Sequence, residues 1–141
     1  MIRKGVTIIV VVFLMGCDRG SQPIEFGADQ CDFCRMTISD PKFGAELITK
    51  KGRVYKFDAA ECMINYMEEE GPEYDHLYAV AYDRPESLYK VDSLYFLISV
   101  EYRSPMGANL AGFKESKSVS EKHRDQLISW KQVCRQLTSI Q

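Results

Sequence analysis

The first seventeen residues constrain this chain most, because they decide which part of it remains to fold. Arg3 and Lys4 precede an apolar stretch over residues 6–15, and the stretch ends at Gly16-Cys17. This order is typical of a secretory signal peptide. A helix of that length spans only about 15 Å, roughly half of a hydrocarbon core, which is too short for a transmembrane helix. We therefore expect residues 1–16 to be removed.

The end of this stretch predicts a lipid anchor. Leu14-Met15-Gly16-Cys17 resembles the lipobox of bacterial lipoproteins, in which cleavage before the cysteine leaves it as a lipid-modified N-terminus. We therefore expect a lipid on Cys17 to hold the protein in the cell envelope, on a bacterial membrane and facing the periplasm. Residues 17–29 contain glycine, serine and proline with scattered apolar side chains, which is typical of a tether. The alternative is a buried apolar N-terminal segment with an incidental cysteine.

Length and charge narrow the class of protein. Without residues 1–16, the 141-residue chain keeps enough length for one ordinary domain with its own core. It carries 18 basic and 20 acidic side chains, and loss of Arg3 and Lys4 makes the mature chain more acidic. This balance argues against nucleic acid as a partner and against polybasic docking on membranes.

A group of sulfur ligands follows the tether. Cys31, Cys34 and Met36 occur within six residues. A pair of thiolates with a thioether suits a soft monovalent metal such as Cu(I) better than zinc, calcium or magnesium. The thiolates would fix the metal, whereas the thioether adds a soft ligand that needs no deprotonation. These three residues are therefore candidate Cu(I) ligands.

The pattern after this group predicts a hairpin, a helix and a third strand. The expected elements are strands over residues 44–49, 53–57 and 77–82 and a helix over residues 59–69. Gly52 would supply the hairpin turn. Asp58 and Glu61 would form a capping box at the start of the helix, and Gly71-Pro72 would end it. This order of elements is β-β-α-β.

The second half is predicted to follow the same plan. The expected elements are strands over residues 94–100 and 109–113 and a helix over residues 119–137. Ser118 and Glu121 would cap that helix. Apolar side chains recur along it at steps of three and four residues, which places Cys134 on the face toward the core.

A local match between the halves indicates an internal duplication. Gly44-Ala45-Glu46-Leu47 is similar to Gly107-Ala108-Asn109-Leu110, and each precedes a predicted helix. We therefore predict an α+β domain over residues 30–141, built from two related halves, about residues 30–85 and 86–141, packed as one compact body. Related positions in the halves would bring Met106 toward the first sulfur group, which makes it a fourth candidate ligand.

These motifs together resemble the NosL family, copper-binding accessory lipoproteins of nitrous oxide reductase assembly. The resemblance rests on the lipobox, Cys31-x-x-Cys34-x-Met36, Phe57-Asp58 before Cys62-Met63, and Ser104-Pro105-Met106-Gly107 before Phe113. It implies two β-β-α-β halves, Cu(I) bound by a cysteine and methionines, and copper delivery outside the cytoplasm. It also implies copper donor and acceptor proteins of the cell envelope as partners, within the nitrous oxide reductase maturation machinery. Arg35 and Ser104 depart from the family pattern, which commonly has glycine and threonine there.

Other interpretations of the cysteines stay open. Cys31 and Cys34 could form a structural or redox-active disulfide in an envelope lipoprotein that serves as an assembly or interaction module. A zinc knuckle completed by Cys62 and His76 is less favoured, because that second pair lacks knuckle spacing. Cys62 is expected in the core, stapled beneath Phe57, more than at a metal. His76 is a lone histidine and a weaker candidate for an auxiliary copper ligand.

Enzymatic function finds no support in the sequence. The chain contains no glycine-rich phosphate loop, no nucleophile elbow and no metalloprotease helix motif. We therefore expect a copper chaperone or carrier rather than an enzyme.

Overall fold

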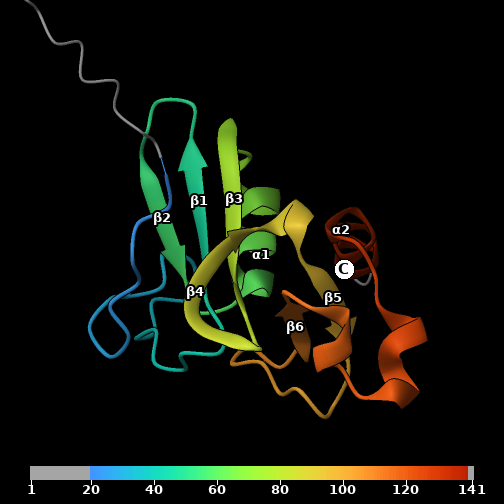
Figure 1. Cartoon of the computed structure of the whole chain (residues 1–141). Helices are drawn as coiled ribbons and strands as arrows, with labels where there is room; N and C mark the ends of the chain where they lie inside the picture. Colours follow the sequence, from blue (N-terminus) through green and yellow to red (C-terminus); the bar gives the residue numbers. More distant parts are fainter. Residues whose placement is uncertain (1–19, 140–141) are drawn as a thin grey trace, which may run out of the picture.

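The computed structural model describes residues 20–139. The predicted signal peptide and the predicted lipidation site Cys17 therefore lie outside the described residues. Figure 1 shows one mixed sheet with two α-helices. The strands are β1 (Ala45–Thr49), β2 (Val54–Phe57), β3 (Tyr74–Ala81), β4 (Arg84–Lys90), β5 (Tyr95–Ile98) and β6 (Leu110–Phe113), and the helices are α1 (Ala60–Glu70) and α2 (Trp130–Thr138). Every helix within residues 20–139 is too short or too polar to cross a bilayer.

The predicted hairpin is confirmed. β1 and β2 pair in antiparallel register, from Ala45 opposite Phe57 to Ile48 opposite Val54. Gly52 adopts a φ of 83° in the turn, and its N–H donates to the carbonyl of Thr49 at 2.8 Å. Glycine reaches this left-handed region without the steric cost that other residues meet. The hairpin sends β2 back toward the start of β1, where α1 begins.

The strands form a single sheet in the order β2-β1-β3-β6-β5, with β4 also paired to β3. The contact between β3 and β6 is parallel, with Ala81 opposite Gly112, and the remaining strand pairs are antiparallel. The α+β class is therefore confirmed. The two hairpins, β1-β2 and β5-β6, occupy the two ends of this order. The relation between the halves stays a prediction.

Strand β4 escaped prediction because its sequence has no strand pattern. Most of its side chains are exposed, and it begins with Arg84-Pro85-Glu86. It nevertheless pairs with β3 from Lys90 opposite Tyr78 to Arg84 opposite Ala81. Hydrogen bonds to a neighbouring strand outweigh a weak local preference, as is common for strands.

The first helix begins differently from the prediction and ends as predicted. Ala59 is the N-cap residue, and no side chain forms a capping hydrogen bond. The predicted Asp58–Glu61 capping box is wrong, because both carboxyl groups are buried in the protein instead. At the other end, Gly71 adopts a φ of 54° and its N–H donates to the carbonyl of Met67 at 3.0 Å.

The second helix is shorter than predicted. Residues Glu121–Gln126 form a 3₁₀ helix, and α2 starts only at Trp130. Between them Ile128 pairs with Phe96 of β5, through N–H to carbonyl bonds of 2.8 and 2.9 Å. This extended pairing breaks the helical pattern. The capping box is formed by Ser129 and Gln132 rather than by the predicted Ser118 and Glu121.

The main core lies between the sheet and the helices. It contains fully buried side chains from β1, α1, β5 and α2, including Leu47, Met63, Phe96 and Val133. Full burial of such a side chain contributes about 1.5–3 kcal/mol. The core thereby fixes α1 against β1 and β2, which determines where the first turn of α1 lies.

Part of the predicted tether packs against the sheet. Ile24 is buried, and the N–H of Gln22 donates to both carboxylate oxygens of Glu46 at 3.0 Å. The Nζ of Lys56 donates to the carbonyl of Pro23 at 2.8 Å. Within residues 20–29, the chain from Gln22 onward is therefore attached to β1 and β2.

Candidate metal centre

Cys31 and Cys34 lie on a tight turn held by its own backbone. The N–H of Cys31 donates to the carbonyl of Met36 at 2.8 Å, and the N–H of Arg35 donates to the carbonyl of Cys31 at 3.0 Å. The N–H of Cys34 points at the Sγ of Cys31, 3.4 Å away. These bonds fix the separation and direction of the two thiols before any metal arrives.

Arg35 adopts a left-handed backbone conformation in this turn, with a φ of 66°. The sequence resemblance expects glycine at this position, and the conformation supplies the physical reason. Its guanidinium lies 4.0 Å from the Asp32 carboxylate, but its side chain is 76% exposed. Such an exposed ion pair contributes little to stability.

Substitution Arg35→Gly is expected to stabilise the protein. A left-handed conformation costs a non-glycine residue roughly 1–2 kcal/mol, against roughly 0.5–1 kcal/mol of extra chain entropy for glycine. We expect the free energy of unfolding in urea to rise by about 0.5–1 kcal/mol. Arg35→Ala is the control, since it removes the ion pair but keeps the strain. A loss of stability in Arg35→Gly would contradict the strain argument.

The third thiol comes from the first turn of α1. The cysteine turn is tied to β2, because the N–H of Asp32 donates to the Lys56 carbonyl and the N–H of Lys56 donates to the Asp32 carboxylate, both at 2.8 Å. Helix α1 begins just after β2, so Cys62 meets the turn. The Sγ atoms of Cys31, Cys34 and Cys62 all lie within 4.8 Å of one another. We call these three residues the thiol cluster.

Burial and hydrogen bonding favour one thiolate in the thiol cluster. Cys31 and Cys62 are fully buried and Cys34 is partly exposed. A hydrogen bond from the Cys62 thiol lowers the pKa of Cys31 to about 5, against the opposing effect of burial. Backbone amides of Asp58, Cys34 and Phe33 add to this lowering. Near neutral pH, Cys31 is therefore the thiolate, which is the form that binds metals.

The other two thiols hold their protons more tightly. Burial raises the pKa of Cys34, with a further contribution from Cys31 nearby. The pKa of Cys62 is raised because its thiol donates to Cys31 and is buried. Burial and the charge on Cys31 also raise the pKa of Asp58, whose Oδ1 atom has no hydrogen-bond partner. A soft cation in the thiol cluster would compensate the negative charge of the Cys31 thiolate.

The two predicted thioether ligands differ from the thiols in exposure, and they stay predictions. Met36 is 57% exposed and Met106 is 41% exposed, so neither thioether is buried with the thiols. His76 lies on β3 beside the ring of Tyr78, with 6.1 Å between ring centroids. The possible metal-binding group within the described residues contains the three cysteines without His76, which argues against the less favoured zinc-knuckle alternative. Cys134 packs against the main core on α2, as predicted.

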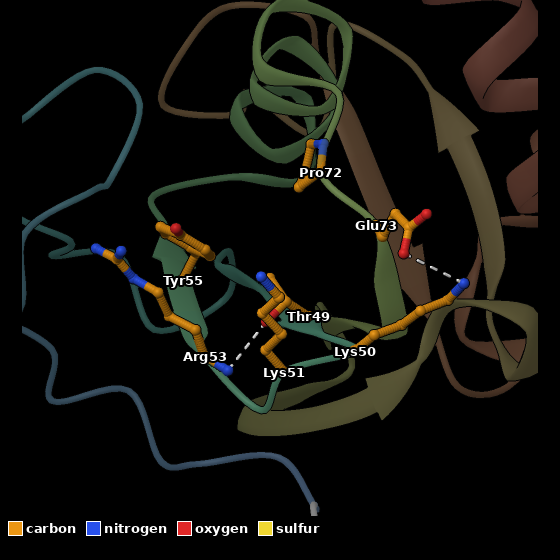
Figure 2. A pocket seen from close by; sticks show the side chains of 7 residues that line it. All are labelled: Thr49, Lys50, Lys51, Arg53, Tyr55, Pro72 and Glu73. Carbon is orange, nitrogen blue, oxygen red and sulfur yellow. Dashed lines mark hydrogen bonds and ion pairs between the residues drawn. The ribbon is translucent and has the colours of Figure 1, made fainter.

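A separate cavity lies away from the cysteine turn. This cavity, shown in Figure 2 and about 450 Å³ in volume, lies at the β1-β2 turn and is lined by Lys50, Lys51 and Arg53. Lys50 pairs with Glu73 at 3.6 Å, and Arg53 lies over the ring of Tyr55 at 4.7 Å. These are cationic and aromatic groups rather than soft ligands, so this cavity is unsuited to copper.

Sequence reasoning underestimated Cys62. The thiol is buried, as expected of a core cysteine, but it is buried against Cys31 rather than among apolar side chains alone. The predicted hairpin could have indicated that Cys62 lies near the cysteine turn. A strand that returns toward the cysteine turn and leads directly into a helix brings the first helical turn to that place.

Comparison with known proteins agrees with the resemblance that the motifs indicated. A model of the NosL family matches residues 23–137. The chain belongs to the NosL family. The resemblance derived from the motifs is thereby confirmed, and the family assignment accords with a non-enzymatic protein. No curated protein matches this NosL-family sequence significantly.

A solved structure shares the fold of this NosL-family chain. The crystal structure of the copper chaperone NosL from Shewanella denitrificans superimposes with a TM-score of 0.64 at 18% sequence identity. The match covers 79% of this chain and 90% of that chain. At this identity the likeness establishes a shared fold.

Proposed function

We propose that this NosL-family protein binds Cu(I) outside the cytoplasm and carries it to an acceptor, as a copper chaperone for nitrous oxide reductase maturation. The observation that supports this most is the thiol cluster, with three Sγ atoms within 4.8 Å of one another. Cu(I) prefers soft thiolate and thioether ligands, whereas magnesium and calcium prefer oxygen ligands. Met36 and Met106 are proposed as thioether ligands that join the thiols when copper is bound.

The exposure of these ligands suits a carrier. Cys31 and Cys62 are buried, whereas Cys34 and the two methionines are accessible to solvent. An acceptor protein can therefore approach from the side of Cys34 and replace accessible ligands one at a time, while the buried thiolates still hold the metal. Ligand exchange of this kind requires no fully dissociated copper ion.

The proposed location is the cell envelope. Cleavage before Cys17 and lipid attachment to it would anchor the protein on a bacterial membrane, facing the periplasm. Copper donors and acceptors of the envelope, including the nitrous oxide reductase maturation machinery, are the proposed partners. Mass analysis of the mature protein tests the anchor, since an unmodified Cys17 contradicts it.

Titration of the reduced protein with Cu(I), against a competing chelator, tests copper binding. We expect one Cu(I) per chain and release of about two protons near neutral pH, because Cys34 and Cys62 must lose theirs to act as ligands. The apparent affinity should therefore increase with pH. Zn²⁺ serves as the comparison metal.

Two results would contradict the proposal. Failure of the fully reduced protein to bind Cu(I) near one equivalent excludes a carrier. A stable Cys31–Cys34 disulfide in natively purified protein without copper favours the alternative of a structural or redox-active lipoprotein. The four described cysteines are free thiols in this structure.

A further inference from the structure

Met106 is carried by a compact turn between β5 and β6. The N–H of Gly107 donates to the carbonyl of Ser104 at 3.0 Å, and the N–H of Asn109 donates to the Ser104 hydroxyl at 2.9 Å. Gly107 and Asn109 adopt φ values of 82° and 57°. Ser104 is buried at the base of this turn, and Met106 lies at its exposed tip. We call residues 104–109 the Met106 turn.

A buried carboxyl group on α1 faces this turn. Glu61 is only 4% exposed, although it belongs to the first turn of the helix. The Ser104 hydroxyl and the backbone amides of Met106 and Ala108 surround its carboxyl group. Neither carboxyl oxygen reaches good hydrogen-bond geometry with them. The donors of the Met106 turn therefore surround one carboxyl group of α1 but do not form well-aligned hydrogen bonds with it.

On another side the Met106 turn borders a cavity. Glu61, Met106 and Ala108 line a space of about 440 Å³, together with the apolar side chains of Ile98 and Leu137. Packing on this side is therefore incomplete, and it restrains the turn less than a filled core would. Glu61 offers the polar connection between the turn and α1.

We infer that Glu61 is a positioning residue, which holds the Met106 turn against the first turn of α1 and so presents the Met106 thioether to the thiol cluster. The same helical turn carries Cys62, one residue further along the chain. A displacement of the Met106 turn therefore changes the distance between thioether and thiols directly. The inference rests on the proposed function, because it assigns Met106 to the bound Cu(I).

Chemistry explains why an acid is suited to this place. An apolar side chain at position 61 would remove the acceptor that faces the buried Ser104 and the two amides of the Met106 turn, which is unfavourable for the buried hydroxyl. A carboxyl group provides two acceptor oxygens, and glutamine still provides one carbonyl oxygen. Glutamine is therefore the conservative variant, and alanine is the disruptive one.

Limited proteolysis tests the position of the turn without copper. Arg103 is exposed and directly precedes the Met106 turn, so trypsin can report its opening. When opening is fast relative to cleavage, the cleavage rate follows the population of the open form. We expect Glu61→Ala to be cut after Arg103 roughly tenfold faster than the parent protein. Glu61→Gln should stay close to the parent, as should Glu69→Ala at an exposed position of α1.

Cu(I) affinity tests whether Glu61 acts through Met106. We expect Glu61→Ala to lower the affinity by about 10–100-fold, as for groups that orient metal ligands. In a Met106→Leu background the same substitution should not lower the Cu(I) affinity further, because the thioether that Glu61 positions is absent. Circular dichroism and thermal unfolding verify that each variant is folded. Where Glu61→Ala is not, Ser104→Ala removes the hydroxyl that faces the same carboxyl group and is expected to show the same faster cleavage and lower affinity.

The outcomes separate this inference from the proposed function. Equal cleavage after Arg103 in Glu61→Ala and the parent overturns the inference, as does an affinity loss that persists undiminished in Met106→Leu. A protein that binds no Cu(I) at all defeats the proposed function instead. In that case faster cleavage of Glu61→Ala would still support a positioning role of Glu61 for the turn alone.

Discussion

Replacement of Cys31 by serine is expected to lower the Cu(I) affinity by more than about 100-fold, since changes to groups that merely orient ligands already cost 10–100-fold. Cys31 is the thiol with the lowered pKa, about 5, and it accepts the hydrogen bond from Cys62. A hydroxyl group does not provide a thiolate at neutral pH. Chelator competition with the reduced protein measures the effect.

Cys134→Ser is the matched control for this experiment. Cys134 is partly buried on α2 and lies outside the thiol cluster. Its substitution should leave the Cu(I) affinity within a few-fold of the parent, although some stability is lost. Cys62→Ser should resemble Cys31→Ser if all three thiols bind the metal. An unchanged affinity in Cys31→Ser would remove the thiol cluster from the copper site.

Substitution Glu46→Gln is expected to change how stability depends on pH. Glu46 is fully buried on β1, and burial raises its pKa from 4.5 to about 7, although the Gln22 amide and Lys56 oppose the shift. The folded state therefore retains this proton more strongly than the unfolded state. The stability it contributes is complete below pH 4.5 and is lost as pH rises through about 7.

Glutamine cannot ionise, so the variant should escape this loss. Relative to the parent, Glu46→Gln should gain about 3 kcal/mol in the free energy of unfolding between pH 4 and pH 8. Urea unfolding at a series of pH values measures the difference between the two proteins, in which the other titrating groups cancel. Glu69→Gln, at an exposed position, is the matched control. A constant difference between parent and Glu46→Gln would mean that Glu46 titrates normally.

Local sequence signals predicted the first half of the fold well. The β1-β2 hairpin with Gly52 and the end of α1 at Gly71 follow from backbone preferences that act within a few residues. The errors arise where distant pairing decides. Ile128 is extended because it pairs with Phe96, and β4 exists because β3 lies beside it. Neither partner can be recognised from the residues around the segment itself.

The candidate site shows the same difference between residues placed by local signals and residues placed by distant contacts. Cys31 and Cys34 were predictable because they are close in the sequence and share one turn. Cys62 depends on the return of β2, and its role beside Cys31 emerges only when the hairpin is folded. Asp58 and Glu61 were assigned to a capping box from their spacing, but burial directs Asp58 toward Cys31 and Glu61 toward the Met106 turn.

The hydrogen bonds between Asp32 and Lys56 have a consequence for solubility. β2 is at the edge of the sheet, and an open edge can recruit strands from other molecules into aggregates. Asp32 occupies both main-chain groups of Lys56 on that edge, one through its backbone and one through its side chain. Because Asp32 lies between Cys31 and Cys34, damage to the cysteine turn would also uncover this edge. We therefore expect oxidation of these thiols to lower the solubility of the protein, in addition to any effect on the thiol cluster.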